Sequence, residues 1–161
     1  MKKHILLVII LLVSMTTNAQ KRMSKNKKAM VNSIEKHKKN LIEISDNIWE
    51  AAEPALLEFK SSNYLSDYAE ENGFTVKKGV AGIQTAFVAE YGSGKPIIGI
   101  MGEFDANLGI SQKKQPIKDP LEKGAPGHGC GHNLFGTASL GAAIAIKEMI
   151  ESGEVEDPGS L

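Results

Sequence analysis

The chain has 161 residues, of which 42% are hydrophobic and 24% are charged, the composition of an ordinary soluble domain. Lysine plus arginine and aspartate plus glutamate number 19 each, so the formal net charge is zero. Because there is no basic excess, nucleic acid and anionic lipid surfaces are disfavoured as partners, and a small molecule is favoured.

The first 19 residues are typical of a secretory signal peptide. Lys2 and Lys3 give a positive start, residues 5–13 form a continuous apolar run, and short side chains precede Ala19. The apolar run is shorter than the roughly 20 residues that cross a bilayer, so no stable membrane span is predicted. We predict cleavage after Ala19, a secreted or periplasmic location, and a basic flexible arm over residues 20–32.

Helical periodicity begins at Ser33. Apolar residues then recur at near-heptad spacing among charged ones, which predicts an amphipathic helix that is kinked or restarted at Pro54. His37 falls among the charged positions, so we expect it at the surface. A second helix is predicted over about Tyr64–Asn72, ended by Gly73.

The periodicity then changes to that of strands. Thr85–Glu90 and Pro96–Gly102 are predicted to form adjacent strands, and the second is apolar on both faces, as in the interior of a covered sheet. Glu103 and Asp105 follow directly. Two carboxylates at the end of a buried strand stand where open α/β sheets place their ligands.

A polar segment with several prolines follows over residues 106–126 and is predicted to form a long loop. Loops of this length in a compact domain are usually functional or disordered. An alanine-rich, packed helix is then predicted, closed by Gly153.

The string GAPGHGCGHN, residues 124–133, places the only cysteine, Cys130, between His128 and His132. Thiolate and imidazole are preferred ligands of zinc and similar ions, and the helix start that follows favours the thiolate. On these residues alone three interpretations stay open. They are a metal-ligand pair of Cys130 and His132, a Cys–His nucleophile pair for acyl transfer, and a purely structural glycine turn.

The segments GIMGEFDANLGISQ, GAPGHGCGHNLFGTASLGAA and KKGVAGIQTAFVAEYGSGKP resemble metal-dependent amidohydrolases of the aminoacylase and carboxypeptidase (zinc peptidase) superfamily, nearest to its p-aminobenzoyl-glutamate hydrolase branch. The resemblance runs from about Ile34 to the C-terminus. It implies an α/β fold with a mixed-sheet, zinc-peptidase-like catalytic domain. Residues 33–161 would be its front part only, with the inserted dimerisation or lid domain absent.

The resemblance also implies roles for individual residues. Cys130 and His132 match a metal-ligand pair, and Asp105 matches the catalytic carboxylate that orients the metal site. Glu103 stands where sister branches have a histidine ligand, which makes it a candidate metal ligand. His128 matches a motif histidine that is not usually a ligand. The full-length family uses two divalent ions, Zn or Mn.

The implied activity is metal-dependent hydrolysis of an amide bond to an amino acid. The substrate would be a small molecule such as p-aminobenzoyl-glutamate, an N-acyl amino acid or a dipeptide, and the full-length form is expected to be a homo-oligomer or to pair with a second subunit. The family's paired glutamates and later histidines do not occur in this sequence, so we expect the 161-residue chain to be an inactive N-terminal fragment. A small exported metal-binding or scaffold protein without catalysis is the alternative.

Overall fold

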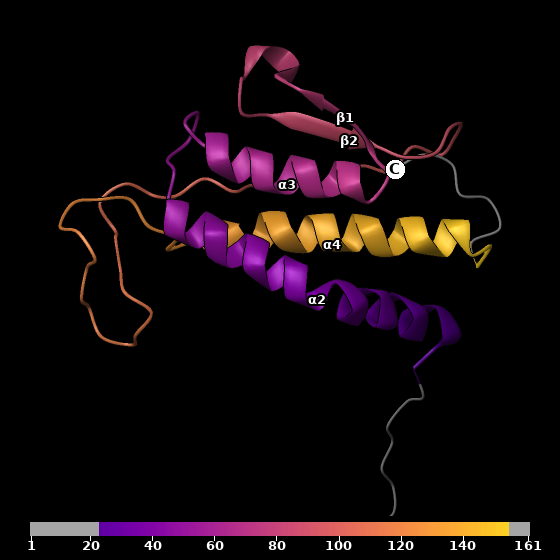
Figure 1. Cartoon of the computed structure of the whole chain (residues 1–161), viewed down its shortest axis with the longest axis horizontal. Coiled ribbons are helices and arrows are strands. Elements are labelled where there is room, and N and C mark those ends of the chain that lie inside the picture. Colours follow the sequence, from indigo (N-terminus) through magenta and orange to yellow (C-terminus); the bar gives the residue numbers. More distant parts are fainter. Residues whose placement is uncertain (1–22, 155–161) are drawn as a thin grey trace, which may run out of the picture.

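The computed structural model describes residues 23–154 (Figure 1). The predicted signal peptide, residues 1–19, lies outside the described residues. In the described part, three α-helices and a two-stranded antiparallel sheet give a mixed α/β architecture, with α4 between α2 on one side and α3 with the strand hairpin on the other (Figure 1). The elements are α2 (Lys25–Ala51), α3 (Phe59–Glu71), β1 (Thr75–Lys78), a 3₁₀ turn (Val80–Gly82), β2 (Phe87–Glu90) and α4 (His132–Glu151).

Helix α2 begins at Lys25, eight residues before the predicted start, so the structure differs from the flexible arm predicted over residues 20–32. The Ser24 hydroxyl accepts a hydrogen bond from the Lys27 amide at 3.3 Å, which is a helix N-cap. The lysines, alanine and methionine that follow have high helix propensity. Few of them are apolar, so apolar periodicity did not predict a helix there. The helix ends before Pro54, as predicted.

Helix α3 begins at Phe59 rather than near Tyr64 because a carboxylate caps its first turn. Glu53 accepts hydrogen bonds from the Lys60 amide at 3.0 Å and from the Ser61 amide at 2.9 Å. A negative charge at the N-terminal end of α3 also interacts favourably with the positive end of the helix dipole. This acid precedes Pro54 and lies several residues before the helix that it caps, so the early start was not foreseen.

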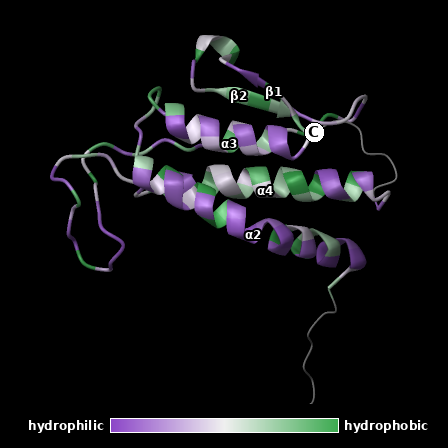
Figure 2. Ribbon diagram, viewed as in Figure 1, coloured by the Kyte–Doolittle hydropathy of each residue, from purple (hydrophilic) through white to green (hydrophobic). Residues whose placement is uncertain are grey.

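The core is formed where the three helices meet. It contains Leu41 and Ile48 from α2, Leu65 from α3 and Ile144 from α4, all nearly inaccessible to solvent. Helix α4 is the most apolar of the three along its length (Figure 2). Its Gly141 allows close packing, because a Cβ there would lie 3.1 Å from a methyl carbon of Leu41. The packed helix α4 is confirmed, and the predicted apolar stripe of α2 is confirmed for Leu41, Ile44 and Ile48 but not for Ile34, which is 37% exposed.

A polar contact also joins the three helices, and its central residue is His37. The side chain is 12% exposed, so the predicted surface position is wrong. His37 Nε2 donates to Glu148 Oε1 on α4 at 2.9 Å, and His37 Nδ1 lies 2.7 Å from the Tyr68 hydroxyl on α3. The charged neighbours of His37 along α2 do point to solvent, but both of its partners come from other helices, which a periodicity within α2 cannot reveal.

The stability of this contact is expected to depend on pH through Glu148. Burial raises the pKa of this carboxyl, but hydrogen bonds from His37 and Lys36 outweigh burial and lower the pKa from 4.5 to about 2. The stabilisation from Glu148 is therefore fully present above about pH 4.5 and is lost as the pH falls toward 2. Urea unfolding at several pH values between 2 and 4.5 measures the free energy of unfolding. In Glu148→Gln this free energy should fall less steeply with decreasing pH than in the unaltered chain. An unchanged pH dependence would contradict this role of Glu148.

The sheet differs from the prediction. β2 pairs with β1 in antiparallel register, from Thr75 opposite Glu90 to Lys78 opposite Phe87. Residues 96–102, predicted as the adjacent interior strand, form no strand in the described structure. This segment instead lies along α4, where the Ser139 hydroxyl donates to the Met101 carbonyl at 2.7 Å. The apolar run has strand composition, but no described strand is placed to pair with it.

The remaining expectations concern the loop and the ends of helices. Residues 106–126 contain no helix or named strand, as predicted, and project from one end of the molecule (Figure 1). Gly73 and Gly153 follow α3 and α4 with φ of 82° and 71°, the left-handed conformation expected of them. Within residues 23–154 no helix is both long enough and apolar enough to span a membrane.

Candidate metal centre

One histidine and two carboxylates converge at the start of α4. His132 Nδ1 lies 2.8 Å from Asp105 Oδ1, and His132 Nε2 lies 3.2 Å from Glu103 Oε2. One donor atom from each of the three side chains lies within 4.8 Å of the others. The histidine and Asp105 are partly buried and Glu103 is about half exposed, so the group is accessible from one side.

Three anchors outside the group hold these residues in place. The Ala106 amide donates to the Glu53 carbonyl at 2.8 Å, which fixes the backbone directly after Asp105. Asn107 and Gly127 exchange two backbone hydrogen bonds of 2.9 Å, so the long loop closes on itself beneath the group. On the helix side, the side-chain amide of Asn133 donates to the Ser45 hydroxyl at 3.1 Å, which connects the first turn of α4 to α2.

The glycines of the string are required by close contacts. A Cβ on Gly127 would lie 2.5 Å from the Ile110 carbonyl oxygen, and one on Gly129 would lie 2.4 Å from an Ile110 methyl carbon. Gly131, at the N-cap of α4, has φ of 74°. The backbone can therefore pass under the loop and turn into the helix at His132, which is the tight folding that the sequence predicts.

His128 is not part of the converging group. Its Nε2 donates to the Ile48 carbonyl at 3.0 Å, near the C-terminal end of α2. Burial lowers the pKa of His128, the hydrogen bond to Ile48 acts in the opposite direction, and the nearby His132 lowers it further. His128 therefore contacts a helix carbonyl, and the expectation that it is not a ligand stays a prediction.

Cys130 is exposed and is not among the three residues that converge. The sequence pattern pairs it with His132, two positions away. The structure brings His132 together with Glu103 and Asp105 instead. A ligand role for Cys130 stays a prediction.

Alkylation of Cys130 tests that prediction. In the metal-free chain the thiol should react quickly with iodoacetamide, because it is exposed to solvent. If the thiolate is a ligand, saturating Zn²⁺ should slow the labelling and a chelator should restore it. Labelling at the same rate with and without Zn²⁺ would remove Cys130 from the metal site, and mass spectrometry of the alkylated chain measures either result.

The donor set fits a divalent cation. Imidazole nitrogen and carboxylate oxygen bind Zn²⁺ and Mn²⁺, and the exposure of Glu103 leaves a path for entry. Asp105 holds one ring nitrogen of His132, and a carboxylate in this position orients a histidine so that its other nitrogen can bind metal. Glu103 and His132 would then hold the ion, with Asp105 as the positioning residue.

The sequence singled out Glu103, Asp105 and His132, and the structure brings them together. What sequence reasoning missed are the anchors Glu53 and Asn133. The contact of Glu53 with Ala106 uses a main-chain carbonyl, so no side-chain pattern in the sequence could reveal it.

The fold and this group define a mixed α/β chain with a histidine–carboxylate group that could hold a metal ion. No family model matches the chain. The chain is homologous to part of a hydrolase: it is 43% identical over 122 residues to one subunit of the p-aminobenzoyl-glutamate hydrolase of Escherichia coli (strain K12). The match covers 74% of this chain and 25% of that relative, so the chain spans about a quarter of the relative's length. The resemblance predicted from the sequence is thereby confirmed.

Proposed function

We propose that this chain carries part of the metal centre of a secreted or periplasmic, metal-dependent amide hydrolase. Its substrate would be a small amide of an amino acid, such as p-aminobenzoyl-glutamate. The observation that carries the proposal is the convergence of Glu103, Asp105 and His132 within 4.8 Å. The homology to part of a hydrolase supports the reaction class.

A divalent cation in such a site supplies Lewis-acid polarisation of an amide carbonyl and of a water molecule. The residues of this chain contribute the binding and positioning. Glu103 and His132 offer the donor atoms, and Asp105 fixes the ring of His132 through the 2.8 Å hydrogen bond. The partial exposure of Glu103 keeps one side of the group open to a substrate.

The isolated chain is expected to bind metal without turning over substrate. Hydrolysis also needs a carboxylate that carries a proton from water to the leaving amine. Both acids of the group already contact His132. The nearby Glu53 is engaged at the start of α3.

A chimera tests the proposal directly. The matched 122-residue stretch of the E. coli relative is replaced by the corresponding residues of this chain, and release of p-aminobenzoate from p-aminobenzoyl-glutamate is measured with and without added Zn²⁺ or Mn²⁺. Metal-dependent hydrolysis that His132→Ala abolishes would support the proposal. A folded chimera that binds metal and remains inactive would contradict it.

The second candidate function is an exported metal-binding protein without catalysis. The exposed Cys130, and the contact of both acids of the group with His132, favour it. A folded chimera that is inactive, together with tight Zn²⁺ binding by the chain alone, is the result expected of this alternative.

The location and the assembly are proposals of the same kind. Cell fractionation should find the chain, shortened after Ala19, outside the cytoplasm. A full-length precursor in the cytoplasmic fraction would contradict export. The relative is named as a subunit, and we propose that this chain likewise associates with a further polypeptide or with copies of itself.

A further inference from the structure

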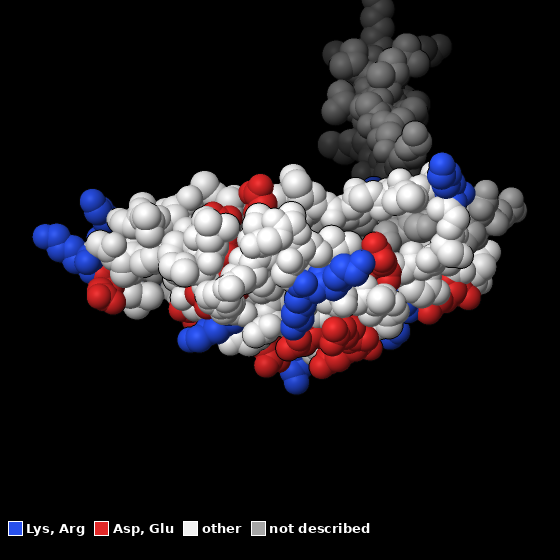
Figure 3. Space-filling view, turned by 90° about the horizontal axis from the view of Figure 1, so that it is seen from above, with Lys and Arg blue, Asp and Glu red and all other residues white. Residues whose placement is uncertain are grey.

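Glu53 uses both of its carboxylate oxygens inside the protein. Oε1 accepts a hydrogen bond from the Lys60 amide, and Oε2 accepts one from the Ser61 amide and another, at 2.8 Å, from the Ser61 hydroxyl. On the face shown in Figure 3, by contrast, charged side chains extend mainly from the edges of the molecule into solvent. Because Ser61 is fully buried, these three hydrogen bonds fix the position of Glu53 more firmly than that of a solvated acid.

The main chain of the same residue contacts the segment that carries the metal group. The Glu53 carbonyl accepts a hydrogen bond from the Ala106 amide at 2.8 Å, and Pro54 forms an isolated parallel bridge with Ala106. Ala106 is buried, so this contact is shielded from water. Asp105, the residue before it, holds one ring nitrogen of His132 at 2.8 Å. The Glu53 contact is therefore one residue away from the carboxylate that orients the histidine.

The turn around Glu53 contains two residues in a backbone conformation that side chains disfavour. Ala52, directly after α2, has φ of 43°, and Leu56 has φ of 68°. Leu56 lies in the turn closed by the hydrogen bond from the Leu57 amide to the Pro54 carbonyl at 3.0 Å, at a place where glycine or asparagine is usual. Such strain persists where surrounding contacts determine the conformation, and it is concentrated at functional sites. Here the strained residues stand on either side of Glu53 and Pro54.

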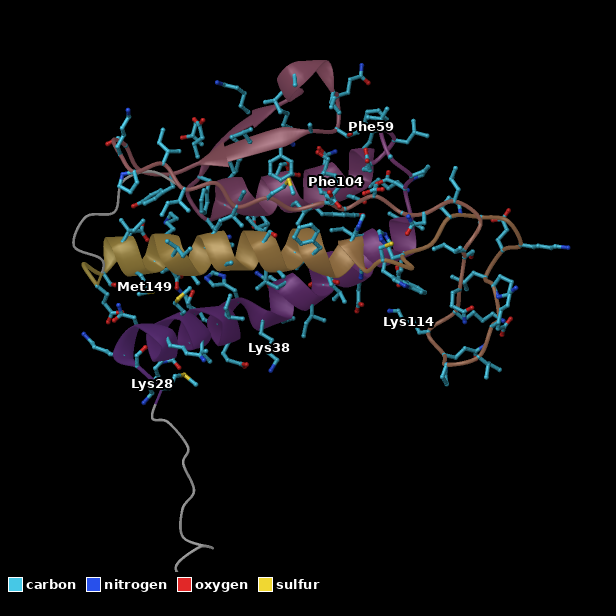
Figure 4. All side chains as sticks on the ribbon, turned by 180° about the vertical axis from the view of Figure 1, so that it is seen from behind. Lys28, Lys38, Phe59, Phe104, Lys114 and Met149 are labelled. Atoms are coloured by element: carbon cyan, nitrogen blue, oxygen red, sulfur yellow. The ribbon has the colours of Figure 1, made fainter. Side chains whose placement is uncertain are left out.

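The ends of the three helices bring this turn close to the metal group. Phe59, the first residue of α3, lies at the end of the molecule from which the long loop projects (Figure 4). α2 ends and α4 begins at the same end (Figure 1). Glu53 is in the connection between α2 and α3, and the metal group is at the start of α4. The path from the first turn of α3 to the metal group is therefore short.

We propose that Glu53 is a positioning residue of the group formed by Glu103, Asp105 and His132. The role rests on the proposed function, because it concerns the same group. The first turn of α3 holds the Glu53 carboxylate and so fixes the strained turn. The Glu53 carbonyl then fixes Ala106 and, through it, Asp105, which sets the direction of the His132 ring. Because coupling between two sites is reciprocal, a bound metal ion should also protect the first turn of α3.

Amide hydrogen exchange of the whole chain, followed by NMR, tests the proposal without metal. In the unaltered chain the Ala106 amide should exchange slowly, because it is buried and bonded to Glu53. Glu53→Ala keeps the carbonyl but removes the carboxylate, and it should speed this exchange about tenfold, the factor expected for the loss of a hydrogen bond to a charged group. Ala52→Val should act in the same direction, since a β-branched residue is more strained at φ of 43°.

A milder variant and a matched control accompany these two. Ser61→Ala removes one of the three hydrogen bonds to Glu53 and should have a smaller effect, which can be measured even if Glu53→Ala does not fold. Asn72→Ala is the control, because it removes a cap at the opposite end of α3, the hydrogen bond of 2.8 Å from the Asn72 side-chain amide to the Tyr68 carbonyl. It should loosen the last turn of α3 and leave the Ala106 amide protected.

Metal binding supplies the second readout. Glu53→Ala should lower the Zn²⁺ affinity about tenfold, as measured with a chromogenic chelator, and should alter the visible absorption spectrum of bound Co²⁺. Asn72→Ala should change neither. In the unaltered chain, saturating Zn²⁺ should slow exchange of the Lys60 and Ser61 amides, which Glu53 holds.

Three results would overturn the proposal. The first is exchange of the Ala106 amide that is as slow in Glu53→Ala as in the unaltered chain. The second is equal acceleration in Glu53→Ala and Asn72→Ala, because the carboxylate would then act only on the stability of α3. The third is Zn²⁺ affinity that Glu53→Ala leaves unchanged. A chain that binds no Zn²⁺ at all would contradict the proposed function, and the exchange of Ala106 would still decide the role of Glu53.

Discussion

Replacing His132 with alanine is expected to lower the affinity of the chain for Zn²⁺ by about 100-fold or more. The imidazole is the only nitrogen donor of the group, and it lies between Glu103 and Asp105. Without it, two carboxylates remain that no longer share a positively polarised partner, and their mutual repulsion separates them. Competition with a chromogenic chelator measures the affinity.

The neighbouring His128 provides the control for this result. His128→Ala removes a histidine four positions away whose ring binds the Ile48 carbonyl. It should leave the Zn²⁺ affinity close to that of the unaltered chain. Asp105→Asn should have an intermediate effect of about 10- to 100-fold, because it disturbs the orientation of His132 but keeps the ligand. Equal losses in the two histidine variants would indicate nonspecific binding.

Ile144→Ala is expected to destabilise the chain by about 2–5 kcal/mol. Ile144 is 1% exposed and lies in the core cluster where α4 packs against α2 and α3. Truncation removes buried methyl groups and leaves a cavity. The three helices packed around Ile144 cannot all shift to fill it. Because domains of this size have marginal stability, the loss is a large fraction of the total.

The matched control uses the same substitution at an exposed position. Ile42→Ala on α2, 53% exposed, should change the unfolding free energy by less than about 0.5 kcal/mol. Urea unfolding followed by circular dichroism measures both variants. A similar small change in both would mean that the α2–α4 contact is not the core that the structure describes.

Local signals predicted α4 and the residues around it correctly. The glycine string requires a tight turn, and the structure explains why: Gly127 and Gly129 have no room for a Cβ beside Ile110. The composition after His132 favours a helix, and Gly153 ends it. These features depend on neighbours in sequence, so a single sequence contains enough information to predict them.

The features that the sequence did not predict depend on distant partners. The contacts of His37 come from α3 and α4, and the early start of α3 depends on a carboxylate of the preceding turn. Residues 96–102 have the composition of an interior strand, but whether they form one depends on a neighbour to pair with. The position of His132 beside Glu103 rather than Cys130 likewise follows from how the loop closes at Asn107.

X-ray absorption at the zinc edge tests the central claim most directly. For the Zn²⁺-loaded chain we predict nitrogen and oxygen ligands at about 2.0–2.2 Å, with imidazole scattering that disappears in His132→Ala. A sulfur ligand at about 2.3 Å in addition would place Cys130 in the same site. Imidazole scattering that persists in His132→Ala would contradict the assignment of the metal to Glu103 and His132.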